Sequence, residues 1–213
     1  MKNKKNKIIL STSFGLLGLT VVSGIAIVCS SCSNELEEIF DYEGFRIWKN
    51  DYDNAVVLME PLDKNQEEYN IPDIVTEIYW GAFEGLTNVK TIAIPSSVTS
   101  IGNNAFGGCT SLTSINIPSS VTFIGEGAFN SCSSLTEINI PDGVTSIGKD
   151  AFRNCTNLTN IEIKNPNVTI DQDDFYNINQ NATITVYSDI VKSRVENATN
   201  LNNLNITIKS NEQ

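Results

Sequence analysis

Cysteine and aspartate are the residue types whose spacing most suggests chemistry, because the 213 residues contain no histidine. That absence removes imidazole acid–base catalysis, histidine-activated nucleophiles and the commonest metal ligand. Cys109, Cys132 and Cys155 recur at a 23-residue spacing. Zinc sites favour short paired spacings such as Cys-x-x-Cys, which the predicted folded part lacks. We therefore expect no enzyme, no catalytic or metal site and no cofactor.

The three recurring cysteines have two structural interpretations. Residues at one repeat position should lie on neighbouring strands about 4.8 Å apart with parallel side chains, and three thiols cannot all pair. We favour buried thiols that pack as small hydrophobic groups. A disulfide between neighbouring repeats is the alternative.

Asp171, Asp173 and Asp174 form a compact acidic segment that invites comparison with calcium loops. Carboxylate oxygens at alternate positions suit that ion. The segment lacks the glycine and the distal glutamate of a known calcium loop, so we favour a solvated turn.

The N-terminus has the pattern of an export signal. Four lysines among the first seven residues precede an uncharged apolar run from Ile8 to Val28, which ends at Ser30-Ser31-Cys32. This ending resembles the bacterial lipobox, which implies a lipoprotein signal peptide at 1–31 and acylation of Cys32, with Cys29 as the alternative. The resemblance places the chain on the outer face of the membrane. An uncleaved helix is the other possibility, since the run is long enough to span a bilayer.

The charge of the remaining chain narrows the range of partners. Four of the fourteen Lys and Arg residues lie in 1–31, so the rest carries ten basic against twenty-five acidic residues, a net charge of about −15. Nucleic acid and anionic lipid surfaces require clusters of Lys and Arg, which this sequence does not contain. We expect no nucleic-acid partner, and membrane contact through the lipid anchor alone.

Self-comparison reveals an internal repeat. Val75, Val98, Val121 and Val144 are spaced at 23 residues, and the residues between them recur in register. Within a block, apolar residues alternate with polar ones and end at Ile-Pro, which predicts a short strand. Ala-Phe and Cys follow three or four positions apart, which predicts one inward-facing helical turn.

Stacking of these blocks should bury one ring of apolar side chains against the next. Phe106, Phe129 and Phe152 are therefore predicted to form a buried column. A recurring glycine should have either a positive φ or a close approach to another backbone segment. That glycine occurs at Gly102, Gly125 and Gly148.

The repeated motif is Cys-x-x-Leu-x-x-Ile-x-Ile-Pro-x-x-Val-x-x-Ile-Gly-x-x-Ala-Phe. It resembles the BspA-like leucine-rich repeat of bacterial surface proteins, over residues 64–188. The resemblance implies an α/β solenoid, right-handed and gently curved, with short parallel strands alternating with single helical turns. It also implies attachment to host or neighbouring-cell proteins. The last block loses its Gly and Ala, so regular geometry is predicted only as far as residue 165.

The ends of a solenoid need caps that cover the terminal core. Residues 43–63 predict a capping hairpin, because apolar and polar residues alternate on both sides of a polar turn. Residues 189–213 predict a C-terminal cap with a polar helical stretch and a strand. Residues 32–42 are acidic with few apolar residues, and we interpret them as a tether.

The outward positions of the predicted strands are the candidate binding face. They form two columns on the predicted concave side, where repeat proteins commonly bind. No aromatic or arginine anchor stands in either column, so a plain solvated sheet is the alternative. The candidate residues are Glu68, Asn70, Thr91, Ser114, Asn116, Glu137, Asn139, Asn160 and Glu162.

Three functions follow in order of preference. The first is a lipid-anchored surface protein that adheres to a host or neighbouring-cell protein. The second is a structural surface protein that self-associates through the solenoid ends. A solute-binding lipoprotein comes last, because stacked repeats leave no interdomain cleft for a small-molecule substrate.

Overall fold

The structure, a computed structural model, describes residues 6–8, 26–29, 36–49, 54–171, 173–198 and 205–209. Cys32 lies outside these residues, and so does most of the predicted signal peptide. Its described parts are two short strands, β1 (Asn6–Ile8) and β2 (Ala26–Cys29), both paired with β3 (Leu36–Tyr42). Among the described residues, none of the helices has the length and apolar character needed to cross a membrane.

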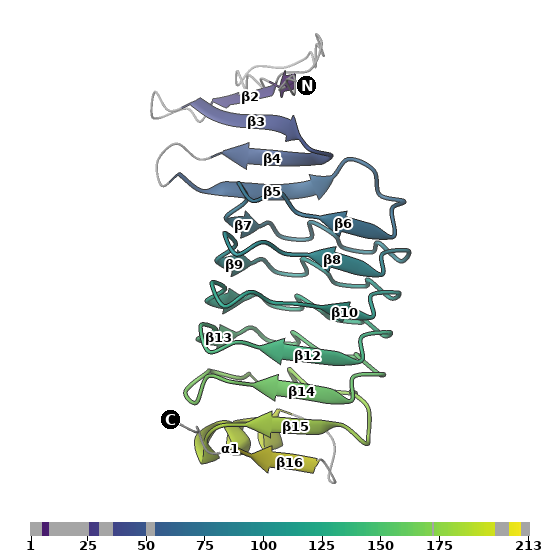
Figure 1. Cartoon of the computed structure of the whole chain (residues 1–213), viewed down its shortest axis with the longest axis vertical. Coiled ribbons are helices and arrows are strands. Elements are labelled where there is room, and N and C mark those ends of the chain that lie inside the picture. Colours follow the sequence, from purple (N-terminus) through teal and green to yellow (C-terminus); the bar gives the residue numbers. More distant parts are fainter. Residues whose placement is uncertain are drawn as a thin grey trace.

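The repeats stack into a solenoid with strands on two sides (Figure 1). We call these sides the back sheet and the front sheet. The back sheet contains β7 (Glu77–Ile78), β9 (Ser100–Ile101), β11 (Phe123–Ile124) and β13 (Ser146–Ile147). The front sheet contains β6 (Glu68–Asn70), β8 (Thr91–Ala93), β10 (Ser114–Ile115), β12 (Glu137–Ile140), β14 (Asn160–Ile163), β15 (Thr183–Val186) and β16 (Asn205–Ile208).

The parallel register of the back sheet equals the repeat length. Ile78 pairs with Ile101, Ile101 with Ile124, and Ile124 with Ile147. All four isoleucines are at most 2% exposed, so they point inward. A turn joins each front strand to the back sheet, as where the Val98 N–H donates to the Pro95 carbonyl at 3.1 Å. The predicted short parallel strand of each repeat is confirmed in the front sheet, whereas the second strand of each repeat, in the back sheet, was not predicted. The right hand of the winding stays a prediction.

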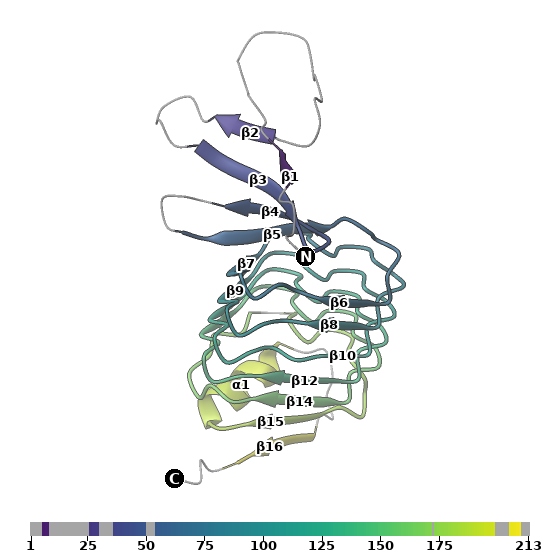
Figure 2. The same ribbon diagram turned by 45° about the horizontal axis from the view of Figure 1, so that its top comes forward.

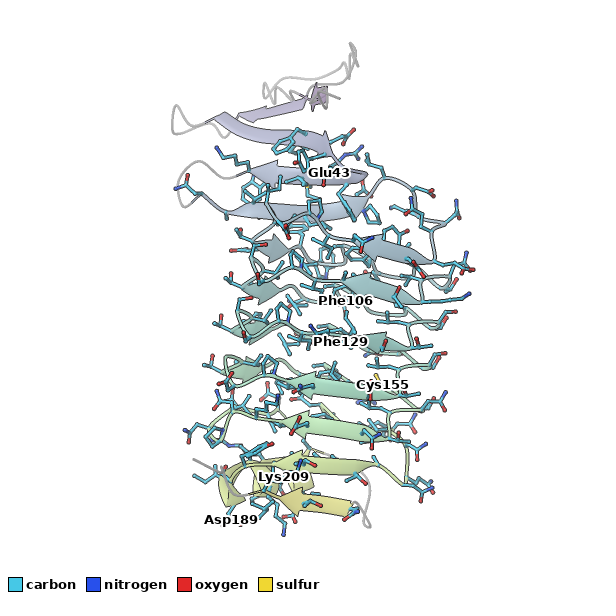
Figure 3. All side chains as sticks on the ribbon, in the orientation of Figure 1. Glu43, Phe106, Phe129, Cys155, Asp189 and Lys209 are labelled. Carbon is cyan, nitrogen blue, oxygen red and sulfur yellow. The ribbon has the colours of Figure 1, made fainter. Side chains whose placement is uncertain are left out.

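The predicted phenylalanine column is confirmed and is longer than expected. Phe106, Phe129 and Phe152 are fully buried, and their rings stack at centroid distances of 5.2 and 5.3 Å. Figure 3 labels Phe106 and Phe129, which come from successive repeats. Phe83 extends the column at one end and Phe175 at the other, at 5.4 and 5.5 Å. Regular geometry thus continues past residue 165, further than the sequence predicted.

The predicted helical turn in each repeat is wrong, because these backbones form a run of turns. The N–H groups of Ala105, Gly107 and Cys109 donate to carbonyls three residues back. The N–H groups between them, on Asn104, Phe106 and Gly108, donate instead to carbonyls of the next repeat. A helical turn would keep these bonds within its own repeat. The described α-helix is α1 (Asp189–Asn197), beyond the repeats.

The recurring glycines Gly102, Gly125 and Gly148 lie close to another backbone segment, which is the second of the two predicted possibilities. None of the three has a positive φ. A Cβ at Gly125 would lie 2.6 Å from the Asn103 backbone nitrogen, and one at Gly148 would lie 2.6 Å from that of Glu126. Each glycine is therefore needed because the preceding repeat passes directly beneath it.

Positive φ angles occur at two other columns of the repeat. Gly, Asn, Asp or Ser occupies these positions, and such residues, above all Gly and Asn, enter the left-handed region more readily than others. The first column is Gly81, Asn104, Gly127, Asp150 and Asp173, and the second is Gly85, Gly108, Ser131, Asn154 and Asn177.

The N-terminal hairpin has strands β4 (Phe45–Lys49) and β5 (Val56–Pro61), and β5 pairs in parallel with β7. Phe45 contacts Tyr69 and Phe83 at 6.1 and 6.3 Å, which supports a capping role. The tether prediction is wrong for Leu36–Tyr42, which is strand β3 paired with β4. Phe40, 8% exposed, is buried in the core, so this segment belongs to the folded body.

The C-terminal end packs α1 against the last repeat. Ser188 precedes the helix, and its hydroxyl accepts a hydrogen bond from the Val191 N–H at 3.2 Å, as an N-cap residue does. Val191 and Val195 are fully buried, and β16 pairs in parallel with β15. These positions match the helix and strand predicted for the C-terminal region.

Candidate functional site

The outward surface of the front sheet is hollowed into a groove of about 740 Å³, which we call the front groove. All nine predicted binding-face residues line it. Figure 2 shows their strands following one another down one side of the solenoid. Sequence reasoning missed Thr183, Thr185 and Lys209, although the two threonines continue the same columns one repeat further on.

Strand register brings the predicted residues together as two columns. Glu68 pairs with Thr91, and Thr91 with Ser114. In the second half of the groove Glu137 pairs with Asn160, and Asn139 with Glu162. No strand pairing joins β10 to β12 in the described chain, so the front sheet consists of a three-stranded part and a four-stranded part.

One predicted ligand residue is already engaged within the protein. The Tyr187 hydroxyl donates to Glu162 at 2.7 Å, and this bond to a carboxylate raises the pKa of Tyr187. Lys209 and Lys164 lie 3.8 and 3.9 Å from the Glu162 carboxylate. Glu68 and Glu137 are exposed in the other rows of the groove. They give most of the groove an acidic character.

The recurring cysteines are free thiols, so the disulfide alternative is wrong. Each Sγ donates to a carbonyl of the preceding repeat, as from Cys132 to Phe106 at 3.2 Å. Burial raises the pKa of Cys109 and of Cys155 to about 12, and that of Cys132 well above its usual range. A thiol held in this neutral form is a packing group with little nucleophilic character.

The acidic segment differs from the predicted solvated turn. Asp174 is fully buried, at the repeat position that alanine occupies in the earlier blocks. Its carboxylate accepts a hydrogen bond from the Asp171 N–H at 2.7 Å, and burial raises its pKa to about 8. Within the part of the chain that the structure describes, no group of three His, Cys, Asp or Glu side chains could hold a metal ion.

Sequence reasoning also missed a set of exposed aromatic side chains on the back of the solenoid. Tyr79 is 47% exposed, Trp80 61% and Phe123 41%. The available signal was the repeat itself, since Phe123 interrupts a column that has serine at Ser100 and Ser146.

Comparison with known proteins identifies the repeat. The profile of the BspA type leucine rich repeat region matches residues 62–182 in six copies. The chain belongs to the BspA-type leucine-rich repeat family. A search of curated proteins found no match.

Solved bacterial structures share the fold of this BspA-type chain. A leucine rich cell surface protein from Faecalibacterium prausnitzii is 26% identical, with a TM-score of 0.57 over 87% of this chain and 43% of its own. A leucine-rich repeat protein from Eubacterium ventriosum is 26% identical, with a TM-score of 0.59 over 76% of this chain and 41% of its own. One from Bacteroides capillosus is 29% identical, with a TM-score of 0.52 over 58% of this chain and 96% of its own. The chain thus spans less than half the length of the first two.

Proposed function

We propose that this chain is a lipid-anchored surface protein that binds a protein of a host or neighbouring cell through the front groove. The observation that carries the proposal is that the groove contains all nine outward residues of the predicted face. A hollow lined by side chains from every front strand suits an extended protein surface better than a small solute.

The composition of the groove fits recognition by hydrogen bonding. Its outward columns present Asn, Thr, Ser and Glu side chains, which offer both donors and acceptors. They lack a large aromatic anchor, so no single contact should dominate the affinity.

The surface location has two supports. The leader resembles the bacterial lipobox at Cys32, and the similar Faecalibacterium protein is a cell surface protein. Acyl chains on the N-terminal cysteine would hold the chain at the outer membrane face.

Adhesion of cells that display the full-length protein tests the binding proposal. The double variant Glu137→Lys, Asn139→Arg puts two basic groups at the centre of the front groove. We expect it to lose most adhesion to host or neighbouring-cell surfaces, whereas Asp142→Lys, at an exposed residue outside the groove lining, keeps it. Equal adhesion by both variants would contradict the groove as the binding surface.

Intact mass measurement tests the anchor. We expect the native protein to lack residues 1–31 and to carry acyl chains on Cys32. The Cys32→Ala variant should lose them, and Cys29→Ala should keep them. A mass that includes residues 1–31 contradicts the lipoprotein proposal and favours the uncleaved helix.

Self-association through the solenoid ends is the second candidate, because apolar side chains lie exposed at the C-terminal end. Ile190 on α1 is 55% exposed and Ile208 on β16 is 42% exposed. An open strand edge beside such residues can pair with another chain. Sedimentation of the wild type against Ile208→Lys tests this candidate, which requires an oligomer that the variant disrupts.

A further inference from the structure

Three exposed aromatic residues lie on the back-sheet strands or directly after them. We call Tyr79, Trp80 and Phe123 the aromatic patch. Ile78 and Ile124 point into the core, so the preceding Phe123 and the following Tyr79 both point outward. Trp80 comes directly after Tyr79, two residues beyond the end of β7, and is 61% exposed.

The spacing of the patch suits one extended partner segment. Phe123 lies two strands from β7, which is roughly 10 Å, and Tyr79 lies about 7 Å further along the strand direction. Their α-carbons are therefore about 12 Å apart. Ser100 on β9 and Gly102 directly after this strand lie between them, so no large side chain stands between the two rings at these positions. A segment of a few residues could contact both rings across these positions.

The repeat shows that folding does not require aromatic residues at these positions. One repeat after Trp80 stands Asn103, and one repeat after Tyr79 stands Gly102. Phe123 has serine at the equivalent position on both neighbouring strands. Exposed aromatic side chains of this kind characterise interaction sites, since Trp and Tyr are the residues that most often dominate binding energy.

The carboxylates near the aromatic patch favour a positively charged partner. Glu77 lies on β7 beside Tyr79 and is partly exposed. The Glu84 carboxylate lies 3.0 Å from where a Cβ of Gly81 would stand, so it bends toward the residue that follows Trp80. The basic neighbours Arg46 and Lys64 already pair with Glu60 at 2.7 and 2.8 Å. The patch therefore combines aromatic faces with carboxylates.

We propose that the aromatic patch binds a basic segment of a partner protein, with an arginine or lysine side chain over Trp80 and near Glu84. A cation over an indole face is attracted by the ring, and arginine also stacks on it by virtue of its planar shape. The overall charge of −11 attracts such a segment from a distance. This site is separate from the front groove and does not depend on it.

Titration of the full-length protein with a defined peptide pair tests the proposal. The probe is a blocked hexapeptide with two arginines and one leucine, and its twin carries uncharged citrulline in place of both arginines. Two-dimensional NMR of the two indole N–H groups follows binding, because the chain has two tryptophans. The signal that disappears in Trp80→Phe belongs to Trp80.

We expect the arginine peptide to shift the Trp80 signal in a saturable way and to leave the Trp48 signal in place. The citrulline twin should bind about three- to ten-fold more weakly, as should the Trp80→Ala variant toward the arginine peptide. Glu84→Gln should weaken binding about two-fold or more. Its matched control is Glu137→Gln, which changes the net charge equally but lies in the front groove, and should bind as the wild type does.

Three results would refute the site. They are equal binding of the two peptides, a Trp80 signal that does not move, and equal weakening by Glu84→Gln and Glu137→Gln, which would indicate general charge attraction. The outcome is independent of the adhesion test of the front groove. Thermal melts of Trp80→Ala, expected to match the wild type because the side chain is exposed, separate loss of binding from loss of fold.

Discussion

The front and back sheets are built from the same 23-residue repeat, yet their outward surfaces differ in kind. The front sheet has Asn, Thr, Ser and Glu in both outward columns, with Ala93 as the exception, and the resulting surface is a broad groove. The back sheet has serine or glycine on both sides of Phe123 and at every repeat after Tyr79 as far as Gly148, and large aromatic side chains stand at Tyr79, Trp80 and Phe123. The regular positions of the repeat thus build the scaffold, and stacking does not require the aromatic residues that depart from it.

The two sheets also differ in continuity. Parallel pairing in the back sheet runs unbroken from β5 to β13, whereas the described pairing of the front sheet stops between β10 and β12. A backbone hydrogen bond from the Thr136 N–H to the Thr113 carbonyl, at 3.2 Å, still joins the two parts of the front sheet.

The largest expected change in stability comes from comparing a buried phenylalanine, Phe129, with an exposed one, Phe123. Phe129→Ala removes a fully buried ring from the middle of the stacked column and should lower the free energy of unfolding by about 3–5 kcal/mol. Phe123→Ser removes an exposed ring and installs the residue of the neighbouring repeats, so a change within about 0.5 kcal/mol is expected. Chemical denaturation of both variants measures the difference, and equal losses would contradict the assigned register.

Periodicity made the scaffold predictable, because each apolar position recurs and the inward parity of a strand follows from its neighbours. The central three rings of the phenylalanine column, the hairpin strands and nine of the residues that line the groove were predicted in this way. The helical turns were not, since the spacing of Ala105, Phe106 and Cys109 fits both a helix and a run of turns. Only the alternation of bonds within and between repeats distinguishes the two.

Departures from the repeat were harder to interpret. Asp174 was expected in solvent because aspartate rarely lies buried, yet register forces it into the alanine position. The Glu162 carboxylate was counted as a ligand group, but Tyr187, twenty-five residues later, donates a hydrogen bond to it. A contact between side chains from different repeats does not show in the spacing of either one.

Asp174 departs from the repeat inside the core, and its contribution to the free energy of unfolding depends on pH. Burial, together with the charges of Asp171 and Asp150, raises its pKa to about 8, above the ordinary value of 3.8. Between these two values the folded state keeps the proton that the unfolded state releases, so stability falls as the pH rises. Asp174→Ala restores the residue of the earlier repeats and should stabilise the fold by about 1–3 kcal/mol at pH 8.

The same substitution should give a much smaller gain at pH 4, where Asp174 is protonated in the fold and the pH is close to the ordinary pKa of 3.8, so little of the penalty remains. Denaturation curves at the two pH values measure this, with the exposed Asp142→Ala as the control that should change little at either. A gain that grows as the pH falls has the wrong sign and would show that Asp174 is ionised and stabilised in the fold.

Tyr187→Phe tests whether the C-terminal end of the front groove is held by its internal contacts. Loss of the hydrogen bond to Glu162 should lower the free energy of unfolding by about 0.5–1.5 kcal/mol. The variant also frees one oxygen of the Glu162 carboxylate for an outside partner. Thr185→Ala, on the same row of the groove, serves as a control and should change stability less. A larger loss for Thr185→Ala would mean that the hydroxyl contact contributes little.

The smallest expected effect concerns the affinity of a single front groove. Seven strands at a spacing of about 4.8 Å span roughly 29 Å, and three residues of about 3.3 Å give each strand a width of roughly 10 Å. The flat footprint of about 300 Å² is below the roughly 800 Å² per partner of a stable interface. No outward aromatic residue concentrates energy there, so one copy should bind weakly.

A lipid anchor changes this, because many copies in one plane raise the effective concentration without any new contact. Residues 33–213 in solution should therefore bind a target cell surface at least about a hundred-fold more weakly than the acylated protein displayed on liposomes. Glu137→Lys with Asn139→Arg should reduce the monomer's binding only a few-fold but abolish most liposome binding, since each contact in the array is weakened. Nanomolar binding by the soluble form, unaffected by the double variant, would show that the binding energy comes from elsewhere, and the aromatic patch would then be the first place to look.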